Sequence, residues 1–128
     1  MAEPVKILLI DDSVDVRRKL IRLLSDDNHI LFEADTEETA LQLIREHDFD
    51  VIFLDIMLPF GVNGLNVLRK AKELRPDLGD VIVLTGWQES NTRQEAELLG
   101  AAYLVKAPFD RKQILEEFNR ALSRRRPG

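Results

Sequence analysis

The stretch VKILLIDDS, residues 5–13, decides the fold class, because a short and mostly apolar run stops at two adjacent aspartates. Four further runs of this kind follow along the chain, and each is four to six residues long. The five runs are residues 5–10, 29–34, 51–54, 81–84 and 101–105. Runs of this length without regular polar alternation are typical of strands that are covered on both faces. The sequence therefore predicts a parallel sheet.

Apolar residues between the runs recur at helical spacing, which places them on one face of a helix. They are Val16, Leu20, Leu23 and Leu24 in the first segment, and Ile114, Phe118, Ala121 and Leu122 in the last. Helix starts are predicted where a capping residue precedes an acid or amide by three positions, at Asp35 with Glu38, Thr92 with Glu95, and Asp110 with Gln113. Five strands alternating with five helices predict an open, doubly wound α/β sheet, since five units are too few for an eight-unit barrel.

The chain of 128 residues has the size of one domain, with 45% hydrophobic and 32% charged residues. Residues 1–124 are predicted to form this domain, and residues 125–128 a tail or the start of a linker. The absence of cysteine excludes thiol catalysis, cysteine-ligated metals and disulfides. A net charge of -5 argues against sequence-independent binding of nucleic acid. Because no apolar run approaches the ~18 residues of a membrane helix, a soluble cytoplasmic protein is expected.

Polar side chains follow four of the predicted strands at the point where each ends. Asp11 and Asp12 follow the first run, Asp55 the third, Thr85 and Gly86 the fourth, and Lys106 the fifth. Because the carboxyl ends of parallel strands meet at one edge of a sheet, these side chains converge on one crevice. Two carboxylates ~4 Å apart repel by ~4 kcal/mol at an effective dielectric near 20, so three of them need a cation or a proton. Mg²⁺ suits such oxygen ligands, although the residues alone leave a chance cluster equally open.

Four segments carry a family resemblance: ILLIDDS at 7–13, VIFLDIMLP at 51–59, VIVLTG at 81–86 and YLVKAPFD at 103–110. In order and spacing they resemble the receiver (CheY-like) domain of bacterial two-component response regulators, over essentially the whole chain. The resemblance implies a flavodoxin-like (βα)5 doubly wound sandwich, with a parallel five-stranded sheet in the order 2-1-3-4-5. It also implies a phosphoacceptor protein rather than an enzyme, which takes its phosphoryl group from a sensor histidine kinase or a phosphotransfer protein.

The resemblance further implies a role for each polar residue at the sheet edge. Asp55 would be the phosphoacceptor, and Mg²⁺ would be held by Asp11, Asp12, Asp55 and the backbone carbonyl of Met57. Phosphoryl binding and switching would fall to Thr85, Gly86, Lys106 and Tyr103.

Phosphorylation would give Thr85 and Lys106 partners that they lack in the free state, and Tyr103 would turn inward. The face formed by the fourth helix, the fifth strand of the sheet and the fifth helix would then change. Through that face the domain would act on an output domain or a target protein, or form a homodimer. The resemblance implies no membrane and no direct contact with nucleic acid.

The loops beside the site depart from the family pattern in two ways. Gly64 lies nine residues after Asp55, where the family usually has eight, so residues 60–63 are expected to hold one added residue. Met57 and Trp87 occupy positions that the family uses to admit or orient the hydrolytic water. Because both are bulky and apolar, they are expected to gate hydrolysis and to make the phosphorylated state long-lived.

Ala107 separates Lys106 from Pro108, whereas in the family a proline usually follows the lysine directly. A cis peptide bond is expected at Ala107–Pro108. The reason is that cis costs ~0.5 to 1 kcal/mol before proline but ~2.5 to 4 kcal/mol before any other residue.

Other functional classes remain as alternatives. An aspartyl phosphotransferase of the haloacid dehalogenase type shares the Asp, Mg²⁺, Thr or Ser and Lys, but needs a DxD nucleophile on its first strand. A flavin carrier shares the fold, but the turn after residue 10 is acidic and lacks a hydroxyl-rich phosphate cradle. A degenerate receiver would serve only as a phosphorylation-independent docking module, and the presence of Asp55, Thr85 and Lys106 argues against it.

Overall fold

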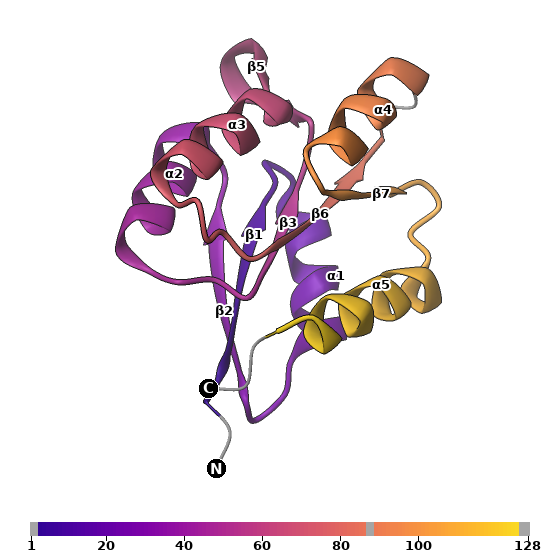
Figure 1. The fold of residues 1–128 in the computed structure, drawn as a ribbon. Coiled ribbons are helices and arrows are strands. Elements are labelled where there is room, and N and C mark those ends of the chain that lie inside the picture. The colour runs from indigo at the N-terminus through magenta and orange to yellow at the C-terminus, as the bar shows by residue number, and fades with distance from the viewer. Residues whose placement is uncertain (1–2, 87–88, 126–128) are drawn as a thin grey trace.

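The computed structural model describes residues 3–86 and 89–125. Five parallel strands form one sheet in the order β2-β1-β3-β6-β7 (Figure 1). The strands are β1 Val5–Ile10, β2 His29–Ala34, β3 Val51–Leu54, β6 Asp80–Thr85 and β7 Ala102–Val105. With the small hairpin β4-β5 set aside, this is the order 2-1-3-4-5, so the expected flavodoxin-like fold is confirmed.

Five helices cover the two faces of the sheet. They are α1 Val14–Leu24, α2 Glu37–Glu46, α3 Gly64–Leu74, α4 Ser90–Leu98 and α5 Arg111–Ser123. Helices α2, α3 and α4 cover one face, and α1 and α5 cover the other (Figure 1). Side chains alternate along each strand, so Leu8 and Ile10 pack with residues of the first layer, whereas Ile7 and Leu9 pack with residues of the second. Two cores result, one on each side, which explains why the central strands β1 and β3 are almost entirely apolar. Among the described residues, no helix is both long and apolar enough to span a bilayer.

Of the three predicted helix caps, one is correct and two are wrong. Asp110 accepts a hydrogen bond from the Gln113 backbone N–H at 3.1 Å, as expected. At α2 the cap is Thr36, one residue after Asp35, and its Oγ1 accepts from Thr39 N–H. Helix α4 begins at Ser90, so Thr92 already lies in its first turn. A cap needs the extended backbone that ends a connection, and that point is set by how the helix packs rather than by residue type alone.

A short hairpin beside the sheet edge was not predicted. Strand β4 Met57–Leu58 pairs antiparallel with β5 Val62–Asn63, and a 3₁₀ turn at Pro59–Gly61 joins them. The added residue expected within 60–63 falls in this hairpin. Phe60 at its tip has φ 63° and is 93% exposed. Asn63 then caps α3 by accepting from the Leu65 backbone N–H at 2.8 Å, which ties the hairpin to the helix that follows.

Helix α5 ends near the amino terminus of the chain. The Arg125 guanidinium donates to the carbonyl oxygens of Glu3 and Pro4 at 2.9 and 3.0 Å and pairs with Asp50 at 3.1 Å. Arg125 therefore contacts the body of the domain, one residue beyond the predicted boundary at 124.

Candidate functional site

Three carboxylates meet at the carboxyl ends of β1 and β3. One oxygen from each of Asp11, Asp12 and Asp55 lies within 4.8 Å of the other two. Asp11 and Asp55 are each 3% exposed, whereas Asp12 is exposed. The sheet fixes this meeting, because the Asp55 backbone N–H donates to the Ile10 carbonyl at 2.9 Å and so extends the strand ladder to the carboxylates. The convergence predicted from strand ends is confirmed for these three residues.

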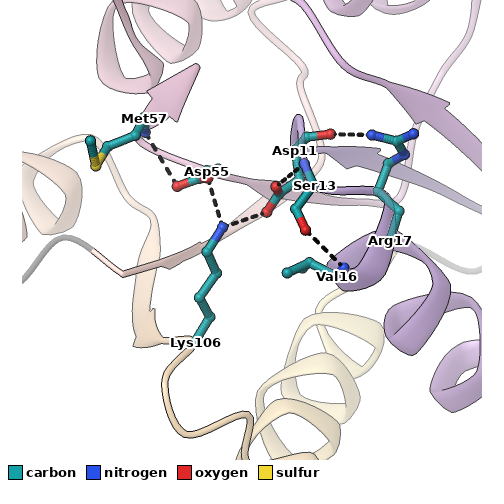
Figure 2. A network of polar contacts seen from close by, with 7 residues as sticks. All are labelled: Asp11, Ser13, Val16, Arg17, Asp55, Met57 and Lys106. Atoms are coloured by element: carbon teal, nitrogen blue, oxygen red, sulfur yellow. Dashed lines mark hydrogen bonds and ion pairs between the residues drawn. The ribbon is translucent and has the colours of Figure 1, made fainter. Parts of the chain in front are cut away.

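Lys106 binds two of the three carboxylates. Its Nζ lies 2.8 Å from Asp55 Oδ2 and 2.9 Å from Asp11 Oδ2, and its side chain is 19% exposed (Figure 2). The Lys106 backbone N–H donates to the Thr85 carbonyl at 3.0 Å, which carries the β6-β7 pairing up to the site. The expectation that Lys106 and Thr85 lack partners in the free state is wrong, because Lys106 pairs with two carboxylates and Thr85 also has an interaction partner. Two buried carboxylates this close need a cation, and the ammonium at the end of β7 supplies it.

Burial and hydrogen bonding shift the pKa values of this cluster. Burial raises the pKa of Asp11, against the opposing effects of the Ser13 N–H and Lys106. Burial by itself lowers the pKa of Lys106, but the hydrogen bonds to Asp55 and Asp11 outweigh it, and the pKa ends above its usual value. Lys106 is therefore charged at neutral pH.

The other residues with predicted roles lie along β6 and β7. Thr85 ends β6 and is fully buried, while Gly86 after it is exposed. Tyr103 on β7 is 8% exposed, and the Arg93 guanidinium lies 5.8 Å from its ring centroid. The Tyr103 side chain is therefore largely buried in this structure. Trp87 lies outside the described residues.

The loop after β3 packs tightly against Asp55. The Met57 backbone N–H donates to Asp55 Oδ1 at 3.2 Å, and the Met57 side chain is half exposed (Figure 2). The Gly64 N–H donates to the Ile56 carbonyl at 2.6 Å. A Cβ on Gly64 would lie 2.1 Å from the Asp55 carbonyl oxygen, so this position requires glycine. Gly64 makes this close approach directly after the hairpin.

The Ala107–Pro108 peptide bond is cis, as predicted.

Ser13, which caps α1, and Arg17 of α1 hold Asp11, and neither was among the predicted site residues. The Ser13 backbone N–H donates to Asp11 Oδ1 at 2.8 Å, and Ser13 also caps α1. Arg17 Nη1 donates to the Asp11 backbone carbonyl at 2.5 Å. In the sequence Arg17 is one of several charged residues on the polar side of a helix, and nothing in the pattern distinguishes it from the solvent-facing ones.

A cavity of about 420 Å³ lies at the opposite edge of the sheet, before β3 and β6. Arginine and aspartate side chains line it, including the pairs Arg124–Asp80 and Arg125–Asp50. It is remote from the carboxylates and gives no support to a flavin at the carboxyl ends of the strands.

Comparison with known proteins places the chain in a family. The family model that matches, the response regulator receiver domain, covers residues 7–119. Sporulation initiation phosphotransferase F of Bacillus subtilis is 28% identical over 117 residues, which are 91% of this chain and 93% of that protein. Transcriptional regulatory protein ResD of the same organism is 34% identical over 86% of this chain and 45% of that protein. The chain thus spans about half the length of some curated relatives.

Solved structures agree with the fold. A receiver domain protein from Methanospirillum hungatei superposes with a TM-score of 0.85 at 27% identity, covering 94% of this chain and 95% of that one. A response regulator from Burkholderia pseudomallei, crystallised with a phosphorylated aspartic acid, a calcium ion and citrate, gives a TM-score of 0.76 at 27% identity, over 94% of this chain and 75% of that one. By its sequence, fold and acidic cluster, the chain belongs to the response regulator receiver domain family.

Proposed function

We propose that this domain is a phosphoacceptor in a two-component pathway and that Asp55 is the residue phosphorylated. The observation that carries the proposal is that the buried Asp55 carboxylate lies beside Asp11 and shares the Lys106 ammonium with it. Receiver domains are signalling modules rather than conventional enzymes. This family membership sets aside the haloacid dehalogenase alternative.

In the proposed reaction, one Asp55 carboxylate oxygen attacks the phosphorus of a phosphohistidine on a sensor kinase or phosphotransfer protein. The new O–P bond forms as the P–N bond breaks, and the imidazole leaves. Lys106 Nζ, now shared between Asp55 and Asp11, would exchange a carboxylate contact for a phosphoryl oxygen. Two relatives support this chemistry: the Bacillus subtilis sporulation initiation phosphotransferase F, and the Burkholderia pseudomallei response regulator with a phosphorylated aspartic acid.

The acidic cluster fits a divalent cation. Three carboxylates and one ammonium leave a formal charge of −2, and carboxylate oxygens are the ligands that Mg²⁺ prefers. Asp11, Asp12, Asp55 and the Met57 carbonyl would hold the ion. When bound, Mg²⁺ would neutralise charge on the transferred phosphoryl group. Asp12 is the exposed member of the set, so it is the one open to an incoming ion.

We propose that phosphorylation is read out through Thr85, Gly86 and Tyr103. Thr85 and Tyr103 are both buried and lie on adjacent strands, where Val83 of β6 pairs with Tyr103 of β7. A rearrangement at the end of β6 is therefore next to the face formed by α4, β7 and α5. That face would contact an output domain, a target protein or a second copy of the domain. The domain would act in the cytoplasm, and residues 125–128 would form a tail or linker whose first residue, Arg125, contacts the domain.

The proposed experiment exposes the chain to acetyl phosphate with Mg²⁺ and measures intact mass. We expect one phosphoryl adduct in the wild type and none in Asp55→Asn or with EDTA. Asp35→Asn is the control, because Asp35 is an exposed carboxylate after β2 at the same edge of the sheet. An adduct in Asp55→Asn would refute the assignment, and no adduct in the wild type would favour the docking-module alternative.

The same experiment tests whether Met57 and Trp87 gate hydrolysis, which we propose because neither side chain readily orients a water. The double change Met57→Asn with Trp87→Glu should shorten the lifetime of the adduct while leaving its formation intact. An equal or longer lifetime, measured with saturating Mg²⁺ and no kinase, would contradict this proposal.

A further inference from the structure

Arg17 of α1 reaches back to the end of β1, and the proposed phosphotransfer chemistry does not use it. Its Nη1 donates to the Asp11 carbonyl at 2.5 Å, and its Nε donates to Glu33 Oε1 on β2 at 2.9 Å. The Arg17 side chain is 13% exposed. Figure 2 shows the guanidinium beside the Asp11 main chain, on the opposite side of Asp11 from Lys106. Arg17 therefore joins three elements at the point where the acidic turn begins.

The turn that begins at Asp11 is held by hydrogen bonds at each polar group of that residue. Its N–H donates to the Ala34 carbonyl at 3.0 Å, and its Oδ1 accepts from the Ser13 N–H at 2.8 Å. Its Oδ2 binds Lys106, and its carbonyl accepts from Arg17. Of these contacts, the one from Arg17 acts on the carbonyl of the peptide that joins Asp11 to Asp12.

Asp12 differs from the other two carboxylates in how it is held. It is exposed, and within the described part of the chain its carboxylate makes no hydrogen bond or ion pair. The direction of the Asp12 side chain is therefore set by the backbone at Asp12 rather than by side-chain contacts. Because the peptide unit is planar, a rotation that moves the Asp11 carbonyl also moves the Asp12 nitrogen and Cα. A contact that fixes this carbonyl also restricts the directions in which the Asp12 Cα–Cβ bond can project.

We propose that Arg17 is a positioning residue for the divalent-cation site. By fixing the plane of the Asp11–Asp12 peptide, it directs the Asp12 carboxylate toward Asp11 and Asp55. This inference rests on the proposed function, since it requires a cation at the acidic cluster. Residues that orient metal ligands in this way typically change metal affinity by about 10- to 100-fold when they are removed.

Positioning and charge predict opposite results when Arg17 is replaced. A guanidinium close to the site repels Mg²⁺, so loss of its charge alone would tighten binding. Loss of positioning would instead let Asp12 adopt other directions and weaken binding. The sign of the change in Mg²⁺ affinity therefore separates the two effects, whatever the change in stability.

The test is calorimetric titration of the whole chain with MgCl₂ at fixed ionic strength. We expect Arg17→Met to bind Mg²⁺ about tenfold more weakly than the wild type. Arg18→Met is the matched control, because Arg18 is the exposed neighbour on α1 and its loss removes the same charge. The control should bind Mg²⁺ as tightly as the wild type or more tightly. Urea unfolding without Mg²⁺ verifies that each variant is folded.

A second pair of variants tests the anchor on β2. Glu33→Gln keeps an oxygen that accepts from Arg17 Nε, and it should retain wild-type affinity. Glu33→Ala removes the anchor and should weaken Mg²⁺ binding by less than Arg17→Met does. If Arg17→Met does not fold, wild-type affinity in Glu33→Ala overturns the inference.

Binding by Arg17→Met that equals or exceeds that of the wild type would overturn the inference alone. A wild-type chain that binds no Mg²⁺ would overturn the metal part of the proposed function and this inference with it. The two failures are therefore distinguishable.

Discussion

Replacing Lys106 with methionine should destabilise the domain in the absence of Mg²⁺. Its ammonium binds Asp11 and Asp55, whose side chains are 5% and 4% exposed. Without it, two buried carboxylates with oxygens within 4.8 Å of each other lose their cation. At that separation and an effective dielectric of 20, their repulsion is about 3.5 kcal/mol. Relaxation and proton uptake recover part of this, so we expect the free energy of unfolding to fall by about 2 to 4 kcal/mol near neutral pH.

The assay is urea unfolding followed by circular dichroism in buffer with EDTA. Lys70→Met is the control because it makes the same substitution in a surface pair, where Lys70 Nζ lies 3.2 Å from Glu37 and the lysine side chain is 54% exposed. An exposed pair contributes less than about 1 kcal/mol, so the control should lose little stability. A loss in Lys106→Met no larger than that of Lys70→Met would refute the reasoning.

The loss of unfolding free energy in Lys106→Met should be largest at intermediate pH and smaller at both extremes. The folded pKa of Lys106 lies above 10.5, so its contribution is fully present below pH 10.5 and is lost as pH rises through the folded pKa. The folded pKa of Asp11 is raised above 3.8, so the folded state takes up a proton on Asp11 before the unfolded state does as pH falls. Protonation removes the repulsion. The deficit should therefore shrink at both ends of the pH range and be largest between them.

Mg²⁺ should reduce the difference in unfolding free energy between the wild type and Lys106→Met. The substitution changes the formal charge of the cluster from −2 to −3, so the variant should bind Mg²⁺ more tightly than the wild type. If its affinity is tenfold higher, saturating Mg²⁺ recovers about 1.4 kcal/mol of the difference. A deficit that stays the same or widens when Mg²⁺ is added would contradict the expectation that the Lys106 charge opposes a cation at this cluster.

Three further substitutions test the loops and caps, each measured by urea unfolding. Gly64→Ala should cost more than about 3 kcal/mol or prevent folding, because the new Cβ would lie 2.1 Å from the Asp55 carbonyl; wild-type stability would mean that the hairpin can move aside. Phe60→Gly should raise stability by about 1 kcal/mol, because φ 63° is strained for phenylalanine and its side chain is 93% exposed; a loss would show that the ring contributes contacts. Asp110→Ala should cost about 1 kcal/mol through loss of the α5 cap, and no change would show that the cap is dispensable.

The pattern of apolar runs was enough to predict the parallel sheet and its two covering layers. Strands that are buried on both faces cannot alternate polar with apolar residues. An uninterrupted apolar run such as residues 51–54 is therefore recognisable as a buried strand. The positions of Asp11 and Asp12 after the first run and of Asp55 after the third also predicted that these carboxylates lie close together. Strand ends in a parallel sheet share one edge, and this constraint does not depend on details of packing.

The hairpin after β3 and the start of α4 depended on tertiary structure. Strands β4 and β5 are two residues each, too short to show a period in the sequence. The α4 start at Ser90 instead of Thr92 reflects the same limit, because several residues near a helix end have capping side chains and packing selects among them.

What the sequence determined by itself is the set of chemical groups at the sheet edge and the strands that bring them there. What the tertiary structure decided is how those groups are paired. Lys106 binds Asp11 as well as Asp55, and Arg17 contacts the Asp11 carbonyl, although these partners are 95 and 6 residues from Asp11. Such contacts follow from burial and from the close packing of α1 against β1 and β2. The residue type shows that a side chain is charged. Only the folded chain determines which opposite charge or carbonyl lies within hydrogen-bonding distance of that side chain.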